Sequence, residues 1–207
     1  MYIRIQNNKL KELIELLSII AGFLIGMGGI INLIVGGIPG ALFFSLGLVT
    51  IVTFKFNLFT GKAGLLFAGE IDGMSLFKIW IGNFVGAAAC AMAVSLLPIG
   101  ERVAEAATEI VETRMTQGSI VNLVSGIFCG ILMYIAVTGY SKTNNYLFCI
   151  VPVALFILCG FNHCVADMFY IGCIRITSYE SFAHLISTTI GNIIGTNLLP
   201  SLDRRGI

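Results

Sequence analysis

The sequence predicts an all-α membrane protein of six transmembrane helices, arranged as two inverted three-helix repeats in which the second and the fifth helix are broken. Three observations lead to this fold class. The first is composition, because 57% of the 207 residues are apolar, only 11% are charged and the mean hydropathy is +0.95, whereas soluble domains carry about 25% charged residues. The second is the succession of apolar runs, and the third is a set of sequence marks that recurs once.

Length and composition limit what the chain can be. At about 20 residues for each span, 207 residues leave room for six spans and short connections. We therefore expect a single transmembrane domain over residues 1–207, with the first repeat at about 12–97 and the second at about 119–200. The polar start of the chain lacks a cleavage site, so no cleaved signal peptide is expected.

Charge and cysteine usage exclude several classes of partner. The formal net charge of +1 argues against a polyanionic partner, so we expect no nucleic acid. The six cysteines lie mostly in apolar runs and form no CxxC motif. They are interpreted as packing residues with free thiols, and neither a metal nor a cofactor is expected.

The first half of the chain contains a long apolar run, an interrupted run and a second long run. Residues 13–35 are long enough to span the membrane. The next run, 41–52, is too short to cross, and it stops before resuming at 63–69, which predicts a discontinuous helix. Such a break is tolerated only where its backbone lines a cavity or is buried in protein. The third span is expected at about 74–97.

The second half repeats this order. Residues 98–117 are too charged to cross the membrane, and we expect a short surface helix or an extramembrane loop there. The fourth span follows at about 119–137. The fifth segment starts at 146, breaks at about 161 and resumes to about 173, and the sixth span runs over about 182–199.

Lysine and arginine are divided unevenly between the two sides of the predicted membrane protein. By the positive-inside bias, the side of the N-terminus is cytoplasmic. We therefore expect a multi-pass protein of the cell membrane with both termini in the cytoplasm. The inner side holds Arg4, Lys9, Lys11, Lys62, Lys78, Lys142, Arg204 and Arg205, and the outer side holds Arg102, Arg114 and Arg175.

Three short marks occur in the same order in both halves: G-x-x-x-G in the first helix, Phe-Asn at the break of the second, and Ile-Gly-Asn-x-x-Gly in the third. Because each unit holds three spans, the second unit must be inverted relative to the first. An inverted repeat with a broken helix in each half is typical of transporters and channels whose site lies near the bilayer midplane. The matched positions are 22–26 and 126–130, 56–57 and 161–162, and 81–86 and 190–195.

His163 is the strongest candidate for chemistry, with Asp167 one helical turn away. This spacing places both side chains on one face of a helix, and ionisable groups at membrane depth are costly unless they face a cavity or a pathway. We expect a pathway role for the pair, the alternative being a histidine that only donates a structural hydrogen bond. His184 lies near the start of the sixth span and is expected at the membrane interface.

Other candidates surround the two breaks. Thr60 either caps the resuming helix or contacts substrate, and the two roles are compatible. Asn83 and Asn192 are flanked by glycines, and they serve either helix packing or the pathway. Lys55 would put positive charge beside the pathway unless it snorkels to the interface, and this charge would favour an anion. Apolar gates, which a hydrated ion cannot pass without losing water, would form from Phe44, Leu48, Leu58, Phe59, Phe156 and Phe161.

The residues around the breaks resemble the signatures of the formate/nitrite transporter family. The resemblance rests on residues 44–48, 58–61, 160–170 and 190–195, and it covers essentially the whole chain. It implies an aquaporin-like fold and a homopentamer in which each protomer carries its own pore. It also implies passage of small monovalent anions such as formate, nitrite or hydrosulfide.

The resemblance assigns roles to individual residues. His163 would be the central pore histidine, Thr60 the hydroxyl on the loop that interrupts the second helix, and Asn192 a polar residue near the histidine. One constriction would consist of Leu48, Phe44 and Phe156, and the other of Leu58, Phe59 and Phe161.

The chain also departs from the family pattern. Family members commonly have glutamate just before the histidine and asparagine four residues after it, whereas this chain has Asn162 and Asp167. The carboxylate has therefore moved along the helix. Arg114 is the candidate for a basic residue that the family places before the fourth span.

These observations favour a channel or channel-like transporter that passes small monovalent anions and is surrounded by membrane lipid. The alternative is an aquaporin-type channel for neutral small solutes, but the paired Asn-Pro-Ala boxes typical of such channels are missing from the sequence. A third class is an intramembrane enzyme. The chain has neither an HExxH motif nor a serine beside His163, so no enzyme is expected.

Overall fold

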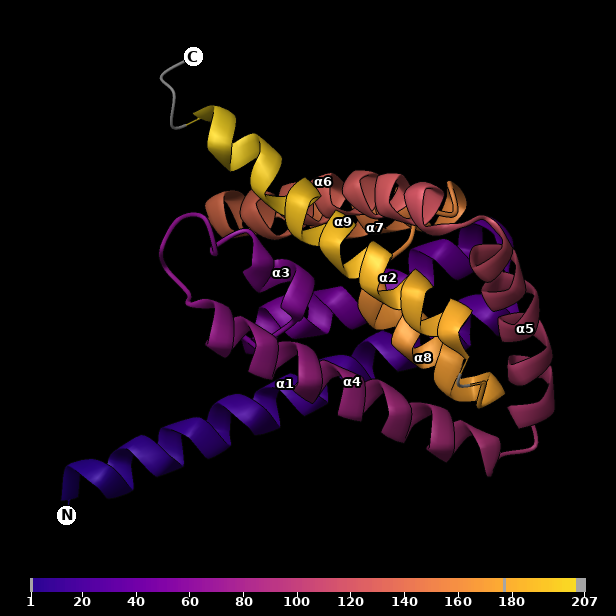
Figure 1. Ribbon diagram of the computed structural model, residues 1–207, viewed down its shortest axis with the longest axis horizontal. Helices are drawn as coiled ribbons and strands as arrows, with labels where there is room; N and C mark the ends of the chain where they lie inside the picture. Colours follow the sequence, from indigo (N-terminus) through magenta and orange to yellow (C-terminus); the bar gives the residue numbers. More distant parts are fainter. Residues whose placement is uncertain (1, 177, 204–207) are drawn as a thin grey trace.

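The computed structural model describes residues 2–176 and 178–203, and all regular structure in these residues is helical. The all-α prediction is therefore confirmed. Figure 1 shows long helices packed along one another, with α5 lying across one end of the bundle. The helices are α1 (Tyr2–Val35), α2 (Gly37–Phe54), α3 (Phe59–Ala63), α4 (Gly73–Ser95), α5 (Gly100–Thr116), α6 (Ser119–Thr143), α7 (Leu147–Leu158), α8 (Cys164–Ile174) and α9 (Tyr179–Asp203).

Several of these helices are suited to a membrane. In the described residues, four stretches are long and apolar enough to cross one: Leu13–Val35, Gly37–Phe54, Gly73–Ser95 and Ser119–Thr143. Leu147–Leu158 and Cys164–Ile174 are apolar but shorter. Helix α9 is absent from both groups because a stripe of polar side chains, described below, lowers its hydropathy. The chain is therefore a multi-pass membrane protein.

Helix α2 is longer than its apolar run indicates. It starts at Gly37, where Gly36 and Gly37 take positive φ angles of 68° and 55°, so the turn after α1 is tighter than expected. Its 18 residues extend roughly 27 Å at about 1.5 Å per residue, close to the hydrocarbon thickness of about 30 Å. The prediction that this run is too short to cross was wrong, because the glycines and Pro39 begin the helix instead of preceding it.

The charged stretch between the two halves is a helix with one buried face. Val103, Ala107 and Val111 repeat every four residues along α5 and are buried, and the helix packs mainly against α8. The prediction of a short helix outside the membrane-spanning runs fits this element. The buried face, however, makes α5 part of the protein core.

The G-x-x-x-G marks lie where two helices touch. A Cβ on Gly22 of α1 would overlap the backbone carbonyl of Asn83 in α4, and a Cβ on Gly130 of α6 would overlap that of Asn192 in α9. Small residues let helix backbones approach this closely. The first and third marks of each half are therefore in contact, through α1 and α4 in one half and through α6 and α9 in the other.

Two short non-helical segments interrupt the bundle. The first, residues 55–58, separates α2 from α3, and the second, residues 159–163, separates α7 from α8. Lys55 and Gly160 take positive φ angles of 59° and 70°, which end α2 and α7. Both breaks fall at the Phe-Asn marks of the sequence.

Candidate functional site

An asparagine from a neighbouring helix braces the first break. Asn83 of α4 accepts a hydrogen bond from the Phe59 N–H (2.7 Å) and donates to the Asn57 carbonyl (2.9 Å) and to that of Ser18 (2.7 Å). The amide thereby satisfies backbone groups on both sides of Leu58 that the interrupted helix leaves without partners. It also ties the break to α1.

Asn192 of α9 braces the second break in the same way. It accepts from the Cys164 N–H (2.9 Å) and donates to the carbonyls of Asn162 (3.0 Å) and Gly126 (2.9 Å). Both amide hydrogens are therefore bound to backbone oxygens. The backbone groups that Asn192 binds lie on either side of His163. His163 therefore occupies the position that Leu58 has in the first break.

His163 directly precedes α8 and has a defined tautomer. The residue is buried and caps the helix, because its Nδ1 accepts the Ala166 N–H at 3.2 Å. A nitrogen that accepts carries no proton, so the neutral ring carries its hydrogen on Nε2. Nε2 lies 2.9 Å from Thr60 Oγ1, and the imidazole therefore donates to the hydroxyl. The two breaks meet at this contact.

Aromatic rings cover the histidine. The Phe156 ring stacks on the imidazole, with centroids 5.4 Å apart, and the Phe44 ring meets Phe156 edge to face at 5.9 Å. Phe44, Phe156 and Leu48 are all buried. Two of the three residues of the first predicted constriction are thus in direct contact, and one of them touches His163.

The second predicted group is more dispersed. Leu58 lines the cavity described below, Phe59 lines an apolar groove between α4 and α9, and Phe161 stacks on Phe128 of α6 at 5.2 Å. The structure therefore gives these three side chains different neighbours. Their joint action as one constriction stays a prediction.

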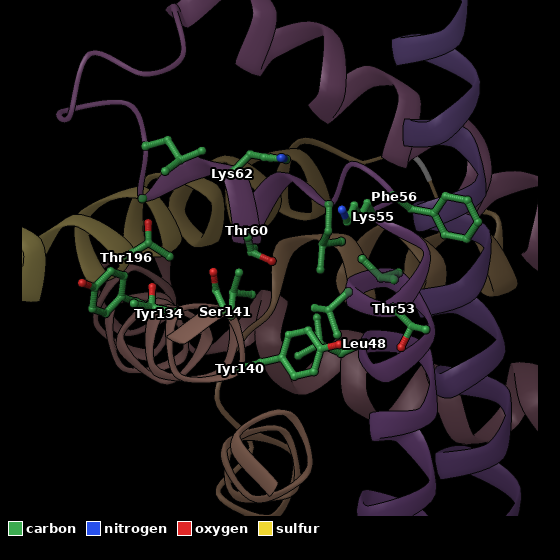
Figure 2. A pocket seen from close by; sticks show the side chains of 18 of the residues that line it. Leu48, Thr53, Lys55, Phe56, Thr60, Lys62, Tyr134, Tyr140, Ser141 and Thr196 are labelled. Atoms are coloured by element: carbon green, nitrogen blue, oxygen red, sulfur yellow. The ribbon is translucent and has the colours of Figure 1, made fainter. Parts of the chain in front are cut away.

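A cavity of about 630 Å³ lies beside the first break. Leu48, Leu58 and Thr60 are among its lining residues, together with hydroxyl groups from α6 and the lysines Lys55, Lys62 and Lys142. Figure 2 shows Thr60, Lys55 and Lys62 bordering the same space. The lining residues include no aspartate or glutamate. Lys55 thus lies beside the break, and the residues of the cavity wall carry positive charge.

Asp167 belongs to a separate buried cluster. Its carboxylate is paired with the Arg114 guanidinium of α5 through Oδ1, and its Oδ2 lies 3.1 Å from His184 Nε2 of α9. The side chains of Asp167 and His184 are each 1% exposed, and that of Arg114 is 12% exposed. The Arg114 guanidinium also lies 5.5 Å from the centre of the Tyr170 ring. His184 is therefore buried in the protein beside Asp167, and its position at the membrane interface stays a prediction.

The spacing of polar residues in α9 could have indicated from the sequence that His184 is buried. His184, Thr188, Asn192 and Thr196 follow one another at intervals of four residues, and all four are buried. A polar residue on every turn of an otherwise apolar helix indicates a face turned toward protein. This stripe also explains the low hydropathy of α9.

Two further residues that sequence reasoning missed connect α5 and α6 to the second break. Asn122 accepts from the Asn162 side-chain amide (2.9 Å) and donates to the Arg114 carbonyl (2.7 Å). Ser125 Oγ accepts the Asn162 N–H at 3.0 Å. Arg114 is consequently held both through its backbone and through its side chain.

Comparison with known proteins gives consistent matches. Residues 6–202 match the family model for formate/nitrite transporters. The formate channel FocA of Haemophilus influenzae is 30% identical over 199 residues, which span 75% of this chain and 69% of that protein. The formate channel FocA of Escherichia coli K12 is 28% identical, over 79% of this chain and 71% of that protein.

Two solved structures share the fold. A pentameric formate channel with formate bound superposes with a TM-score of 0.80 at 22% identity, covering 95% of this chain and 97% of that one. An ion channel of the FNT family superposes with a TM-score of 0.81, also at 22% identity, covering 97% of this chain and 91% of that one.

Proposed function

This chain belongs to the formate/nitrite transporter family, and from that premise we propose that it is a channel or channel-like transporter for small monovalent anions of the formate, nitrite and hydrosulfide class. The observation that carries the proposal is the hydrogen bond between Thr60 and His163 at the wall of a cavity lined by lysines. A transport role, and not catalysis, follows from the same premise.

The lysines of the cavity gather anions. Lys55, Lys62 and Lys142 line it with no carboxylate among the lining residues, so the local potential is positive and raises the concentration of anions near the break. The apolar side chains of Leu48, Phe44 and Phe156 then remove water from the ion.

Thr60 and His163 replace part of the lost hydration. Because Thr60 Oγ1 accepts the hydrogen of His163 Nε2, its own hydroxyl hydrogen is free to donate to an anion in the cavity that Thr60 lines. Hydrogen bonds in a chain polarise one another, so this donor is stronger than an isolated hydroxyl. Asn192 has both amide hydrogens bound to carbonyls, and we assign it to positioning His163.

Proton transfer is available when the anion is the conjugate base of a weak acid. A proton passed from the imidazolium of His163 to the bound anion would produce a neutral acid, which crosses the remaining apolar residues at lower cost. The imidazolium forms only if Nδ1 gives up the Ala166 N–H. Protonation is thus coupled to the N-terminal cap of α8.

The architecture proposed for this channel has six spans in two inverted repeats, with an aquaporin-like arrangement and both termini in the cytoplasm. The matching braces of Asn83 and Asn192 across the two breaks support the repeat. The similarity to a solved pentameric formate channel supports a homopentamer in which each protomer carries its own pore.

A flux assay in proteoliposomes tests the function. Formate, nitrite, hydrosulfide, chloride and water are measured side by side for the wild type, His163→Asn, Thr60→Val and Thr60→Ser. We expect the wild type to pass monovalent anions. The flux should fall about tenfold in Thr60→Val, because one hydrogen bond to a charged group contributes about 1.5 kcal/mol. Thr60→Ser keeps the hydroxyl and should retain the flux. Water permeability without anion flux would favour the aquaporin-type alternative. Flux of His163→Asn equal to wild type at every pH would exclude the proton-donor role.

A further inference from the structure

The cavity beside the first break is larger than a small monovalent anion requires. Its volume is about 630 Å³, within the range of about 300–1,000 Å³ that is usual for ligand sites. Formate and nitrite have only three heavy atoms each. The size of the cavity therefore leaves room for a second and larger kind of ligand.

Three lysines from three separate parts of the chain line this cavity. Lys55 follows the end of α2, Lys62 lies in α3, and Lys142 lies in the last turn of α6. The ion pairs found in the described residues join Asp167 to Arg114 and to His184, and none involves these lysines. Their charges are thus available to a ligand.

The backbone of Lys55 ends α2 directly beside the cavity. Lys55 has φ 59° and ψ 37°, the left-handed region, which costs a non-glycine residue roughly 1–2 kcal/mol. Asn144 and Arg175 end α6 and α8 in the same conformation, which is a common way for a helix to end. This cap places Lys55 at the edge of the cavity that it lines.

We propose that the cavity binds a small polyphosphate, a compact anion with several negative charges, and that this ligand blocks the passage of monovalent anions. Ammonium groups bind phosphate as point charges, and three of them match the charge of pyrophosphate. Hydroxyls of Thr60 and Ser141, which also line the cavity, supply neutral donors. A multiply charged anion cannot shed its water at the buried side chains of Leu48 and Phe44, so it stops at the cavity. The inference rests on the proposed channel function.

Binding is tested without any measurement of transport. Pyrophosphate is titrated into the detergent-solubilised full chain by isothermal calorimetry, in the absence of divalent cations and at low ionic strength. Lys55→Gln, Lys62→Gln and Lys142→Gln are each expected to weaken binding about fivefold to tenfold, in line with a charge-assisted hydrogen bond. Lys78→Gln is the matched control, because Lys78 is an exposed lysine of α4 outside the cavity. Absent binding, or an equal loss in Lys78→Gln, would overturn the proposal.

Flux and lipid composition complete the test. In proteoliposomes that pass formate, pyrophosphate should inhibit with a half-maximal concentration near its dissociation constant, and the three glutamine variants should need about fivefold to tenfold more of it. If pyrophosphate binds but leaves formate flux unchanged, only the proposed block is refuted. If pyrophosphate binds but the protein passes no formate, only the proposed channel function is refuted.

The phosphate of a lipid headgroup offers the same chemistry as free pyrophosphate. A higher pyrophosphate requirement in phosphatidylglycerol vesicles than in phosphatidylcholine vesicles, still present at an ionic strength that screens the surface charge of the vesicles, would identify a lipid headgroup as the source.

Discussion

The cluster of Arg114, Asp167 and His184 shows how single side chains connect the elements of this protein. The three residues come from α5, α8 and α9, and they are almost completely buried. A buried ion pair contributes little net stability compared with apolar residues of similar size, but removing one partner is costly. Since ionisable groups in membrane proteins are costly and therefore usually functional, the cluster is best understood as holding α8, and with it His163, in one position.

Asp167→Asn should destabilise the protein by about 3 kcal/mol, because it leaves the buried Arg114 guanidinium without a counter-charge. Arg114→Met in the same background should recover part of this loss, since it removes the stranded charge. Unfolding free energies of the two single variants and the double variant in detergent form a cycle that measures the coupling. Strictly additive effects would show that the pair does not interact in solution.

The histidines illustrate what residue patterns can and cannot predict. His163 was identified from its spacing to Asp167 and its position at a helix break. Its contact with Thr60, 103 residues away, joins the two breaks that the repeat pairs. His184 was missed because its nearness to the end of an apolar run concealed the polar stripe to which it belongs. The partner of Asp167 was not predictable, because the spacing within α8 says nothing of α5.

At the scale of helices, the two breaks are held from outside. A break removes backbone hydrogen bonds, and a single asparagine on α4 or α9 supplies replacements on both sides of one residue. The Ile-Gly-Asn mark therefore combines two functions, since its glycine lets the helices approach and its amide braces the break. The sequence predicted the positions of the breaks and the paired marks. It did not predict the start of α2 or the docking of α5, because both depend on how the turns direct the chain.

Asn192→Ala and Asn83→Ala should each lower the free energy of unfolding by about 2 kcal/mol or more, because each strands buried backbone groups at about 1–3 kcal/mol per group. Their effects on anion flux should differ, since Asn192 spans His163 and Asn83 spans Leu58. We expect a greater loss of flux in Asn192→Ala. Gln117→Ala, at an exposed amide side chain at the end of α5, is the control and should change stability by less than about 1 kcal/mol. Equal flux in the two buried-site variants would argue against positioning of His163 by Asn192.

At the scale of the whole molecule, the ends of the chain and the cavity share one side. The start of α1 and the end of α9 lie at the end of the bundle opposite α5 (Figure 1), and the cavity is lined by the last turns of α6. The basic residues that favour a cytoplasmic location for this side include Lys62 and Lys142. Arg204 and Arg205, which count toward the same bias, lie outside the described residues.

The cavity is therefore predicted to open toward the cytoplasm, and thiol labelling can measure its direction. Cys159 is the exposed cysteine of the described chain, the other five being buried, so Cys159→Ser provides a background of low reactivity. In that background Ser141→Cys, in the cavity wall, should react with a membrane-impermeant maleimide in inside-out vesicles and not in intact cells. Glu105→Cys, on the exposed face of α5, should show the opposite pattern, because α5 lies at the other end of the bundle. Reaction of Ser141→Cys in intact cells, with Glu105→Cys protected, would reverse the orientation and place both the lysines and the proposed polyphosphate site outside the cell.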